Sequence, residues 1–287
     1  MNHSVEREPE SASEKRFGFG KNWSRYLNLV DETRISEACR SITRPLGLQR
    51  LDGLRFLDIG SGSGLSSLAA HRLVTRYAEE ASWTHSVSYT TALAAARVLA
   101  SAWVPDADWR GVDPTMIVES VNTALALEPN VLEFVEKLTA TQSIVLLGSG
   151  AASTTAREGA LKLREAAGRF VATSGVEEFL HGILPSVSPA SAVVAFTATE
   201  LERRRAREAL QAAARVGALT MLLDSSGVAA GDGEWSVPLP FPELAAMPQI
   251  VPVQLTAHWL AVSEGRNPDV MGLDDARYLE ARQGFGI

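Results

Sequence analysis

The sequence predicts an α/β protein whose parallel sheet is flanked by helices on both faces. Two observations support this prediction. From residue 141 to residue 226, short apolar runs alternate with helical stretches, which is the order that builds a parallel sheet. Two glycine-rich turns, at 60–64 and 148–150, each follow an apolar run and precede a helical stretch, as strand-to-helix connections of such folds do.

The order of strands and helices follows from local composition. Short apolar runs predict strands, and longer stretches of helix-forming residues predict helices. The predicted helix at 156–168 ends at Gly168, a residue type that commonly ends helices. The predicted strands cover 143–148, 169–174, 190–198, 218–226 and 235–240, and the predicted helices cover 88–103, 114–127, 130–138, 156–168, 176–182, 200–217 and 249–265.

The first part of the chain is organised differently. Residues 1–16 are polar and of mixed charge, so we expect a disordered tail without a signal peptide. Residues 55–73 predict a strand, a glycine-rich turn and a helix, a partial Rossmann-like unit that no second parallel strand follows. No apolar run approaches the roughly 18 residues that a membrane span needs.

Composition excludes several classes of function. The net charge of −7 over 287 residues and the pI near 5.4 disfavour nucleic acid as a partner, because binding its phosphates needs a cationic face. Cys39 is the single cysteine, so neither an intrachain disulfide nor a thiolate metal cluster can form. We expect a soluble cytoplasmic protein with no membrane partner and no bound metal.

Three charged residues on the predicted helix 156–168 are candidates for acid/base chemistry. Glu158, Lys162 and Glu165 lie at positions i, i+4 and i+7, which places them on one helix face. Two interpretations are open: an exposed ion pair worth about 0.3–0.5 kcal/mol, or groups that move a proton between adjacent sugar carbons. His181, after the next strand, is open to a structural or a catalytic role.

The glycine-rich turn before that helix is a candidate ligand loop. Gly148 and Gly150 allow tight backbone geometry, and the hydroxyls of Ser149 and Ser153 lie near the start of the helix. Free N–H groups and the positive end of a helix dipole can hold a phosphate or sugar hydroxyls. The pattern is common in strand-to-helix turns, so it also fits a loop that binds no ligand.

The segment EGALKLRE at 158–165, followed by EEFLHG at 177–182, resembles the second lobe of SIS (sugar isomerase) domains. The resemblance is greatest to the isomerase half of glucosamine-6-phosphate synthase and its relatives. It covers about residues 82–287 and is strongest from 141 to 270. It implies a flavodoxin-like sandwich of a parallel sheet between helices.

This resemblance also implies roles for individual residues. Glu165 would move the proton between the first two sugar carbons, and Lys162 would assist it. His181 would promote ring opening in the site of a neighbouring subunit, which implies a homodimer. The substrate-binding residues expected from the loop and the family pattern are Gly148, Ser149, Gly150, Ser153, Glu158 and Glu178.

Residues 17–73 resemble the start of class I S-adenosylmethionine-dependent methyltransferases, through DIGSGSG at 58–64. That resemblance would place Asp58, Gly60 and Gly62 against S-adenosylmethionine. Since one strand–loop–helix unit of that fold is visible, we rank this function last and expect no cofactor. The predicted segments are a tail at 1–16, the methyltransferase-like fragment at 17–74, the remnant of a first SIS lobe at 82–126, and the second SIS lobe with its closing helix at 127–287.

Two departures from the SIS pattern bear on function. The serine-rich phosphate loop of a first SIS lobe is absent, and residues 274–287 hold no lysine that could form an imine with a sugar. We therefore do not expect glutamine-dependent amination. The hypotheses, in order, are an aldose–ketose isomerase for a phosphorylated sugar or amino sugar, a catalytically silent sugar-phosphate-binding or interaction module, and a methyltransferase.

Overall fold

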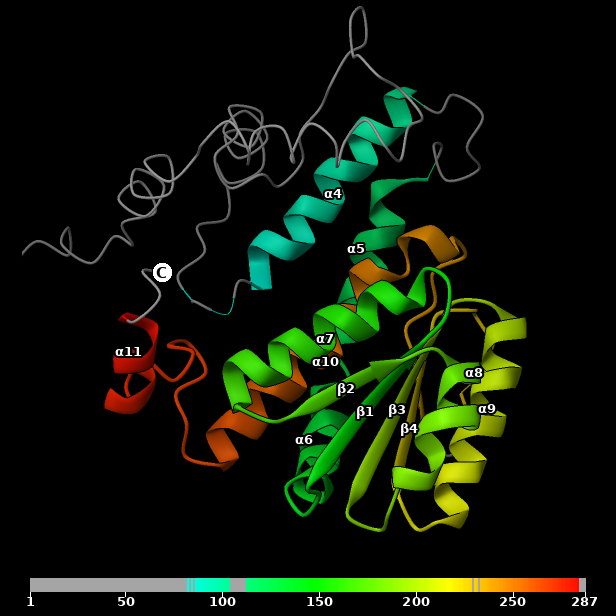
Figure 1. The fold of residues 1–287 in the computed structure, drawn as a ribbon. Helices are drawn as coiled ribbons and strands as arrows, with labels where there is room; N and C mark the ends of the chain where they lie inside the picture. The colour runs from blue at the N-terminus through cyan, green and yellow to red at the C-terminus, as the bar shows by residue number, and fades with distance from the viewer. Residues whose placement is uncertain are drawn as a thin grey trace, which may run out of the picture. The chain divides into compact units, whose positions relative to one another are not determined.

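Five parallel strands form one sheet in the described part of the chain (Figure 1). The computed structural model describes residues 82, 84, 86–103, 112–228, 230–231 and 233–283. The predicted parallel sheet is confirmed, since every pair of neighbouring strands runs parallel. The strands are β1 Ser143–Gly148, β2 Val171–Ser174, β3 Ser191–Thr197, β4 Leu219–Asp224 and β5 Glu234–Ser236, in the order β2–β1–β3–β4–β5.

The strand order reverses beside β1. The strand β2 lies on one side of β1, and β3 lies on the other, which is the flavodoxin-like order. In open α/β sheets, ligands commonly bind in the crevice at the carboxyl ends of the two strands where the order reverses. Gly148 ends β1 and Thr197 ends β3, so the topology alone marks these two residues as one possible ligand site.

Helices cover both faces of the sheet (Figure 1). Ile144 and Leu146 of β1 pack with α6, α7 and α10, whereas Val145 and Leu147 point to the other face, where α8 and α9 lie. Among the described helices, none is long and apolar enough to cross a membrane. The helices are α4 Ser86–Trp103, α5 Pro114–Leu125, α6 Glu128–Leu138, α7 Ala152–Ala167, α8 Val176–Glu178, α9 Glu200–Arg215, α10 Ala246–Ser263 and α11 Ala276–Gln283, with short turns η3 Phe179–Ile183, η4 Leu184–Ser186 and η5 Pro242–Leu244.

Several elements differ from their predicted form: α11 was not predicted, α7 begins at Ala152 instead of residue 156, and β5 ends at Ser236 instead of residue 240. Backbone pairing continues past β5, since the N–H groups of Val237 and Leu239 donate to the carbonyls of Asp224 and Ser225. Pro238 and Pro240 lie at the alternate positions, where this edge strand needs no N–H donor. The predicted short helix after β2 is one α-helical turn that continues as a π-helix, in which the N–H of Leu184 donates to the carbonyl of Phe179.

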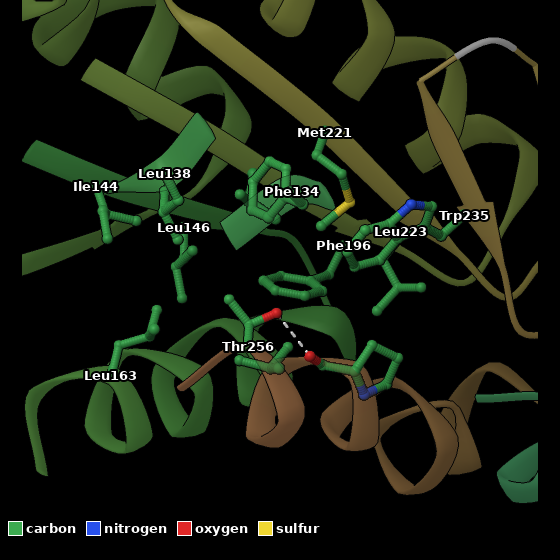
Figure 2. A pocket seen from close by; sticks show the side chains of 13 residues that line it. Phe134, Leu138, Ile144, Leu146, Leu163, Phe196, Met221, Leu223, Trp235 and Thr256 are labelled. Atoms are coloured by element: carbon green, nitrogen blue, oxygen red, sulfur yellow. Dashed lines mark hydrogen bonds between the residues drawn. The ribbon is translucent and has the colours of Figure 1, made fainter. Parts of the chain in front are cut away.

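A small apolar cavity lies between the sheet and the helices α7 and α10 (Figure 2). Its volume is about 20 Å³, and apolar side chains such as Phe134, Phe196 and Met221 line it. Thr256 also lines this cavity, and its hydroxyl donates to the carbonyl of Pro252 at 2.7 Å. Pockets for small molecules are typically hundreds of cubic ångströms with several polar groups, so this cavity is not a sugar site.

Candidate functional site

Three charged side chains of α7 form a cluster that is largely removed from solvent. The Nζ atom of Lys162 lies 2.7 Å from Oε2 of Glu165 and 3.4 Å from Oε1 of Glu158. The lysine side chain is 3% exposed, and those of Glu158 and Glu165 are 15% and 14% exposed. This burial excludes the interpretation as an exposed ion pair. We call these three residues the α7 cluster.

The helix α7 carries the cluster on one face because its other face packs in the core. The core face is made of small and apolar residues, among them Ala156, Ala160 and Leu163. Gly159 lets α10 approach closely, since a Cβ at this position would lie 2.8 Å from Cγ1 of Val253. The amphipathic pattern of α7 therefore orients the cluster.

The three N–H groups of the Lys162 ammonium are all engaged. They face Glu165, Glu158 and the backbone carbonyl of Thr84, just before α4. The lysine thus positions both glutamates and attaches the start of α4 to α7. Among the described residues, none donates a hydrogen bond to the second oxygen of Glu165, Oε1, which leaves that oxygen able to accept a proton.

The candidate loop between β1 and α7 is held by its own hydrogen bonds. The hydroxyl of Ser153 donates to the carbonyl of Gly150 at 2.7 Å, and the N–H of Ala152 donates to the carbonyl of Ser149 at 3.1 Å. Gly150 has a φ of +54°, a conformation that glycine adopts readily. The prediction of a tight glycine turn is therefore confirmed, and its ligand role stays a prediction.

The loop lies at the start of α7, and the α7 cluster extends from Glu158 to Glu165 along the same helix. Along the helix axis, Ser153 is about 18 Å from Glu165 and about 7.5 Å from Glu158, at 1.5 Å per residue. The carboxylate of Glu202 also approaches the loop, because a Cβ at Gly150 would lie 3.0 Å from Oε1 of Glu202. This carboxylate disfavours a phosphate at the loop.

The structure separates His181 and Glu178 from the α7 cluster. Both lie in the α8 and η3 turns, on the opposite face of the sheet. The His181 side chain is 80% exposed, with Nε2 3.7 Å from the carboxylate of Glu177. Glu178 accepts a hydrogen bond from the hydroxyl of Ser174 at 3.0 Å. Within one subunit, His181 therefore cannot act on a ligand that Glu165 contacts.

Three further candidates lie outside the described residues, namely Asp58, Gly60 and Gly62. The structure therefore does not test a cofactor site at the first glycine turn. In the described ranges, no group of three or more His, Cys, Asp or Glu side chains is arranged to hold a metal ion.

A buried amide that sequence reasoning missed crosses the carboxyl end of the sheet. Gln249 of α10 is fully buried. Its Oε1 accepts from Thr155 at 3.0 Å, and its Nε2 donates to the carbonyl of Thr197 at 2.8 Å and to the hydroxyl of Ser225 at 3.1 Å. In the sequence, the signal for this residue was a single glutamine within the apolar stretch that begins α10. These bonds fill the place between α10 and the strand ends, so the amide has a structural role.

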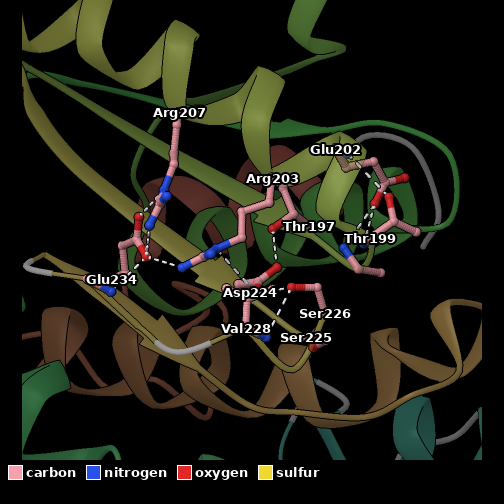
Figure 3. Close-up of polar contacts among 12 residues, drawn as sticks. Thr197, Thr199, Glu202, Arg203, Arg207, Asp224, Ser225, Ser226, Val228 and Glu234 are labelled. Carbon is pink, nitrogen blue, oxygen red and sulfur yellow. Dashed lines mark hydrogen bonds and ion pairs between the residues drawn. The ribbon is translucent and has the colours of Figure 1, made fainter.

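A second charged cluster joins α9 to the strands β4 and β5 (Figure 3). Arg203 contacts Asp224 at 3.5 Å and Glu234 at 2.6 Å, and Arg207 contacts Glu234 at 2.5 Å. The hydroxyl of Thr197 donates to Asp224 at 2.6 Å. Two cations and two carboxylates thus neutralise one another, which indicates a structural role for this cluster.

We predict that Glu234 makes stability depend on pH in acid. Hydrogen bonds from Arg207 lower the pKa of Glu234 from 4.5 to about 2. Because the folded pKa is the lower one, its contribution is complete above about pH 4.5 and is lost as the pH falls towards 2. Urea unfolding should therefore show a difference in free energy between wild type and Glu234→Gln that shrinks over this range.

The control for this titration is Glu133→Gln, which changes an exposed glutamate of α6. We expect Glu133→Gln to stay within about 0.5 kcal/mol of wild type at every pH. A difference for Glu234→Gln that is constant from pH 6 to pH 2.5 would contradict the prediction.

Comparison with protein families decides which family this fold represents. The sequence pattern of the SIS domain family matches residues 137–263, from the end of α6 to the end of α10. This part of the chain is a SIS domain. The SIS domain includes the whole sheet and the α7 cluster, so the resemblance predicted from residues 158–165 is confirmed.

This chain is homologous to the isomerase half of glutamine–fructose-6-phosphate aminotransferase (isomerizing). The protein of that name from Bacillus spizizenii is 27% identical over an alignment of 255 positions, which covers 85% of this chain and 41% of the relative. The one from Pyrococcus horikoshii is 28% identical over an alignment of 277 positions, which covers 91% of this chain and 45% of the relative. The chain thus spans less than half the length of these relatives.

The longer alignment bears on the N-terminal segment. Because it includes 91% of the chain, it must take in part of residues 17–73. The methyltransferase resemblance of that segment is therefore not borne out.

Solved structures similar to the SIS domain support its fold. The C-terminal domain of glucosamine-fructose-6-phosphate aminotransferase from Francisella tularensis has a TM-score of 0.57 and 24% identity, covering 67% of this chain and 58% of that one. Tagatose-6-phosphate ketose/aldose isomerase from Escherichia coli has a TM-score of 0.52 and 20% identity, covering 67% of this chain and 53% of that one. At these identities the likeness establishes the fold alone.

Proposed function

We propose that this protein binds a phosphorylated sugar or amino sugar at the α7 cluster and interconverts its aldose and ketose forms. The observation that carries the proposal is the buried Lys162, which holds Glu158 and Glu165 in place. The relatives named above act, by their names, on fructose 6-phosphate or tagatose 6-phosphate, which supports a sugar phosphate as the ligand. The expected compartment is the cytoplasm.

In the proposed reaction, Glu165 takes the proton from C2 of an open-chain aldose phosphate. The C–H electron pair forms the C1–C2 double bond of an enediol, while the carbonyl oxygen at C1 takes a proton from water. Glu165 then returns its proton to C1, and the C2 hydroxyl gives its proton back to water, which leaves the ketone. The ammonium of Lys162, 2.7 Å away, keeps the carboxylate oriented, and no oxidant or reductant is consumed.

We propose a homodimer as the working form. His181 is exposed on the face of the sheet opposite the cluster, so it can reach a cluster only in a second copy. There its imidazole would exchange a proton with the ring oxygen during ring opening. The phosphate is proposed to bind away from the loop at Gly150, because Glu202 approaches that loop.

A catalytically silent binding module is the second candidate function. The observation that favours it is that the sequence holds no exact match to the S-x-S-G-x-T phosphate loop expected of a first SIS lobe, the nearest stretch being SGSGLS at 61–66. A weakened phosphate loop loses hydrogen bonds to a charged group, each worth about 1.5–3 kcal/mol. Such a module would bind a sugar phosphate through the α7 cluster without turning it over.

The test is a thermal shift measurement with fructose 6-phosphate, glucose 6-phosphate and glucosamine 6-phosphate. Free glucose and inorganic phosphate are the matched controls. We expect the melting temperature to rise with at least one sugar phosphate and not with the controls, because a ligand of the folded state stabilises it by mass action. If no sugar phosphate raises it, the proposed function is wrong.

A mixing experiment tests the shared site. Neither Glu165→Gln nor His181→Ala should isomerise a sugar phosphate alone. In a mixture of the two variants, some dimers contain one subunit of each kind. One of their two sites then combines the native Glu165 of one subunit with the native His181 of the other, so part of the activity should return. A mixture as inactive as its components would contradict the homodimer with shared sites.

A further inference from the structure

Tyr89 of α4 lies beside the α7 cluster. The start of α4 is attached on two sides, since the carbonyl of Thr84 accepts from Lys162 and that of Ser86 accepts from Gln254 of α10 at 3.2 Å. Tyr89 follows Ser86 by three residues, which places both on one helix face. Its ring packs against the apolar core that α7 and α10 share. The phenol therefore lies where α4 meets α7 and α10.

The hydroxyl of Tyr89 is buried and has no hydrogen-bond partner among the residues that the structure describes. Buried tyrosine hydroxyls usually have a partner, and an unpaired one costs free energy. A phenylalanine would fill the same space without that cost. The hydroxyl thus needs an explanation that packing does not supply.

The phenol stays protonated at neutral pH. Burial, and then the charge of Glu158, raise the pKa of Tyr89 to about 12. A neutral phenol near the Glu158 carboxylate pairs a hydrogen-bond donor with a group that, when ionised, only accepts. A group that bridges them must both accept and donate, which a sugar hydroxyl does and a phosphate dianion does not.

We propose that Tyr89 is a substrate-binding residue of the α7 cluster, whose hydroxyl donates to a sugar hydroxyl that in turn donates to Glu158. This inference rests on the proposed function and deepens it. The charges of the cluster also set the orientation of the ligand. One ammonium and two carboxylates give the cluster a net negative charge, which repels a phosphate. The hydroxyl-bearing end of the sugar lies at the cluster, and the phosphate points away from it.

The test compares Tyr89→Phe with Tyr278→Phe, which changes a tyrosine that is 51% exposed on α11. Calorimetry with fructose 6-phosphate and glucose 6-phosphate measures the Kd. We expect Tyr89→Phe to raise the Kd about 3- to 10-fold, the effect of losing one neutral hydrogen bond. The melting temperature without ligand should not fall, because the hydroxyl has no protein partner to lose. Tyr278→Phe should change neither quantity.

Deoxy analogues of glucose 6-phosphate locate the bridging hydroxyl. Removing that hydroxyl should weaken binding to the wild-type protein and should have no further effect in Tyr89→Phe. The inference is overturned if wild type binds and Tyr89→Phe binds equally well, an outcome that leaves the proposed function standing. A lower melting temperature of unliganded Tyr89→Phe also overturns it, since the hydroxyl then has a partner within the protein. If wild type binds no sugar phosphate, both proposals fail.

Discussion

Glu165→Gln is expected to lower the rate of aldose–ketose interconversion by about 10²- to 10⁴-fold, the usual contribution of a general base. The amide oxygen of glutamine can still accept a hydrogen bond from Lys162, as Oε2 of Glu165 does at 2.7 Å. It cannot hold the transferred proton. The measurement is the incorporation of deuterium from solvent into C1 of fructose 6-phosphate and into C2 of glucose 6-phosphate, followed by NMR.

Two comparisons make this result specific to the base. The variant Glu133→Gln changes an exposed glutamate of α6, and it should catalyse deuterium exchange at the wild-type rate. The thermal shift that a sugar phosphate produces in Glu165→Gln should also remain, since binding and proton transfer are separate steps. Exchange at the wild-type rate in Glu165→Gln would show that another group is the base. A wild-type protein that binds the sugar without exchange would support the silent module.

Lys162→Met is expected to lower the free energy of unfolding by about 3–5 kcal/mol, as breaking a buried ion pair does. The methionine preserves most of the volume but removes the ammonium that lies within 3.4 Å of both Glu158 and Glu165. Two part-buried carboxylates then face each other without a cation. The attachment of α4 through Thr84 is lost as well. Urea unfolding measures the effect.

The matched control is Lys137→Met, which changes an exposed lysine at the end of α6. A surface change of this kind should stay within about 0.5 kcal/mol. Adding Glu158→Gln and Glu165→Gln to Lys162→Met should recover part of the stability, because the uncompensated charges disappear. If Lys162→Met costs no more than Lys137→Met, the cluster does not stabilise the fold.

The catalytic half of the candidate site was predictable from sequence because its residues are local. Glu158, Lys162 and Glu165 share a helix face whatever surrounds that helix. Their burial was not predictable from spacing, since it depends on α4, which begins 72 residues before Glu158. The same distance in the chain explains why Thr84 and Tyr89 were missed.

Members of the predicted substrate-binding set lie at different places along α7. The loop at Gly150 and the cluster both belong to the stretch from β1 to α7, so sequence proximity grouped them. A rigid helix keeps residues that are neighbours in sequence apart in space, at 1.5 Å per residue. His181 lies away from the cluster within one subunit because the β1–β2 crossover covers one face of the sheet and the β2–β3 crossover covers the other.

The sequence by itself determined the order of strands and helices, the parallel sheet and the helix that carries Glu165, because these depend on local composition and periodicity. The tertiary structure alone decided that Lys162 is buried with all three donors engaged. It also decided that the hydroxyl of Tyr89 is buried beside the cluster. Burial and hydrogen-bond partners arise where distant segments pack together, and no local pattern specifies which segments those are.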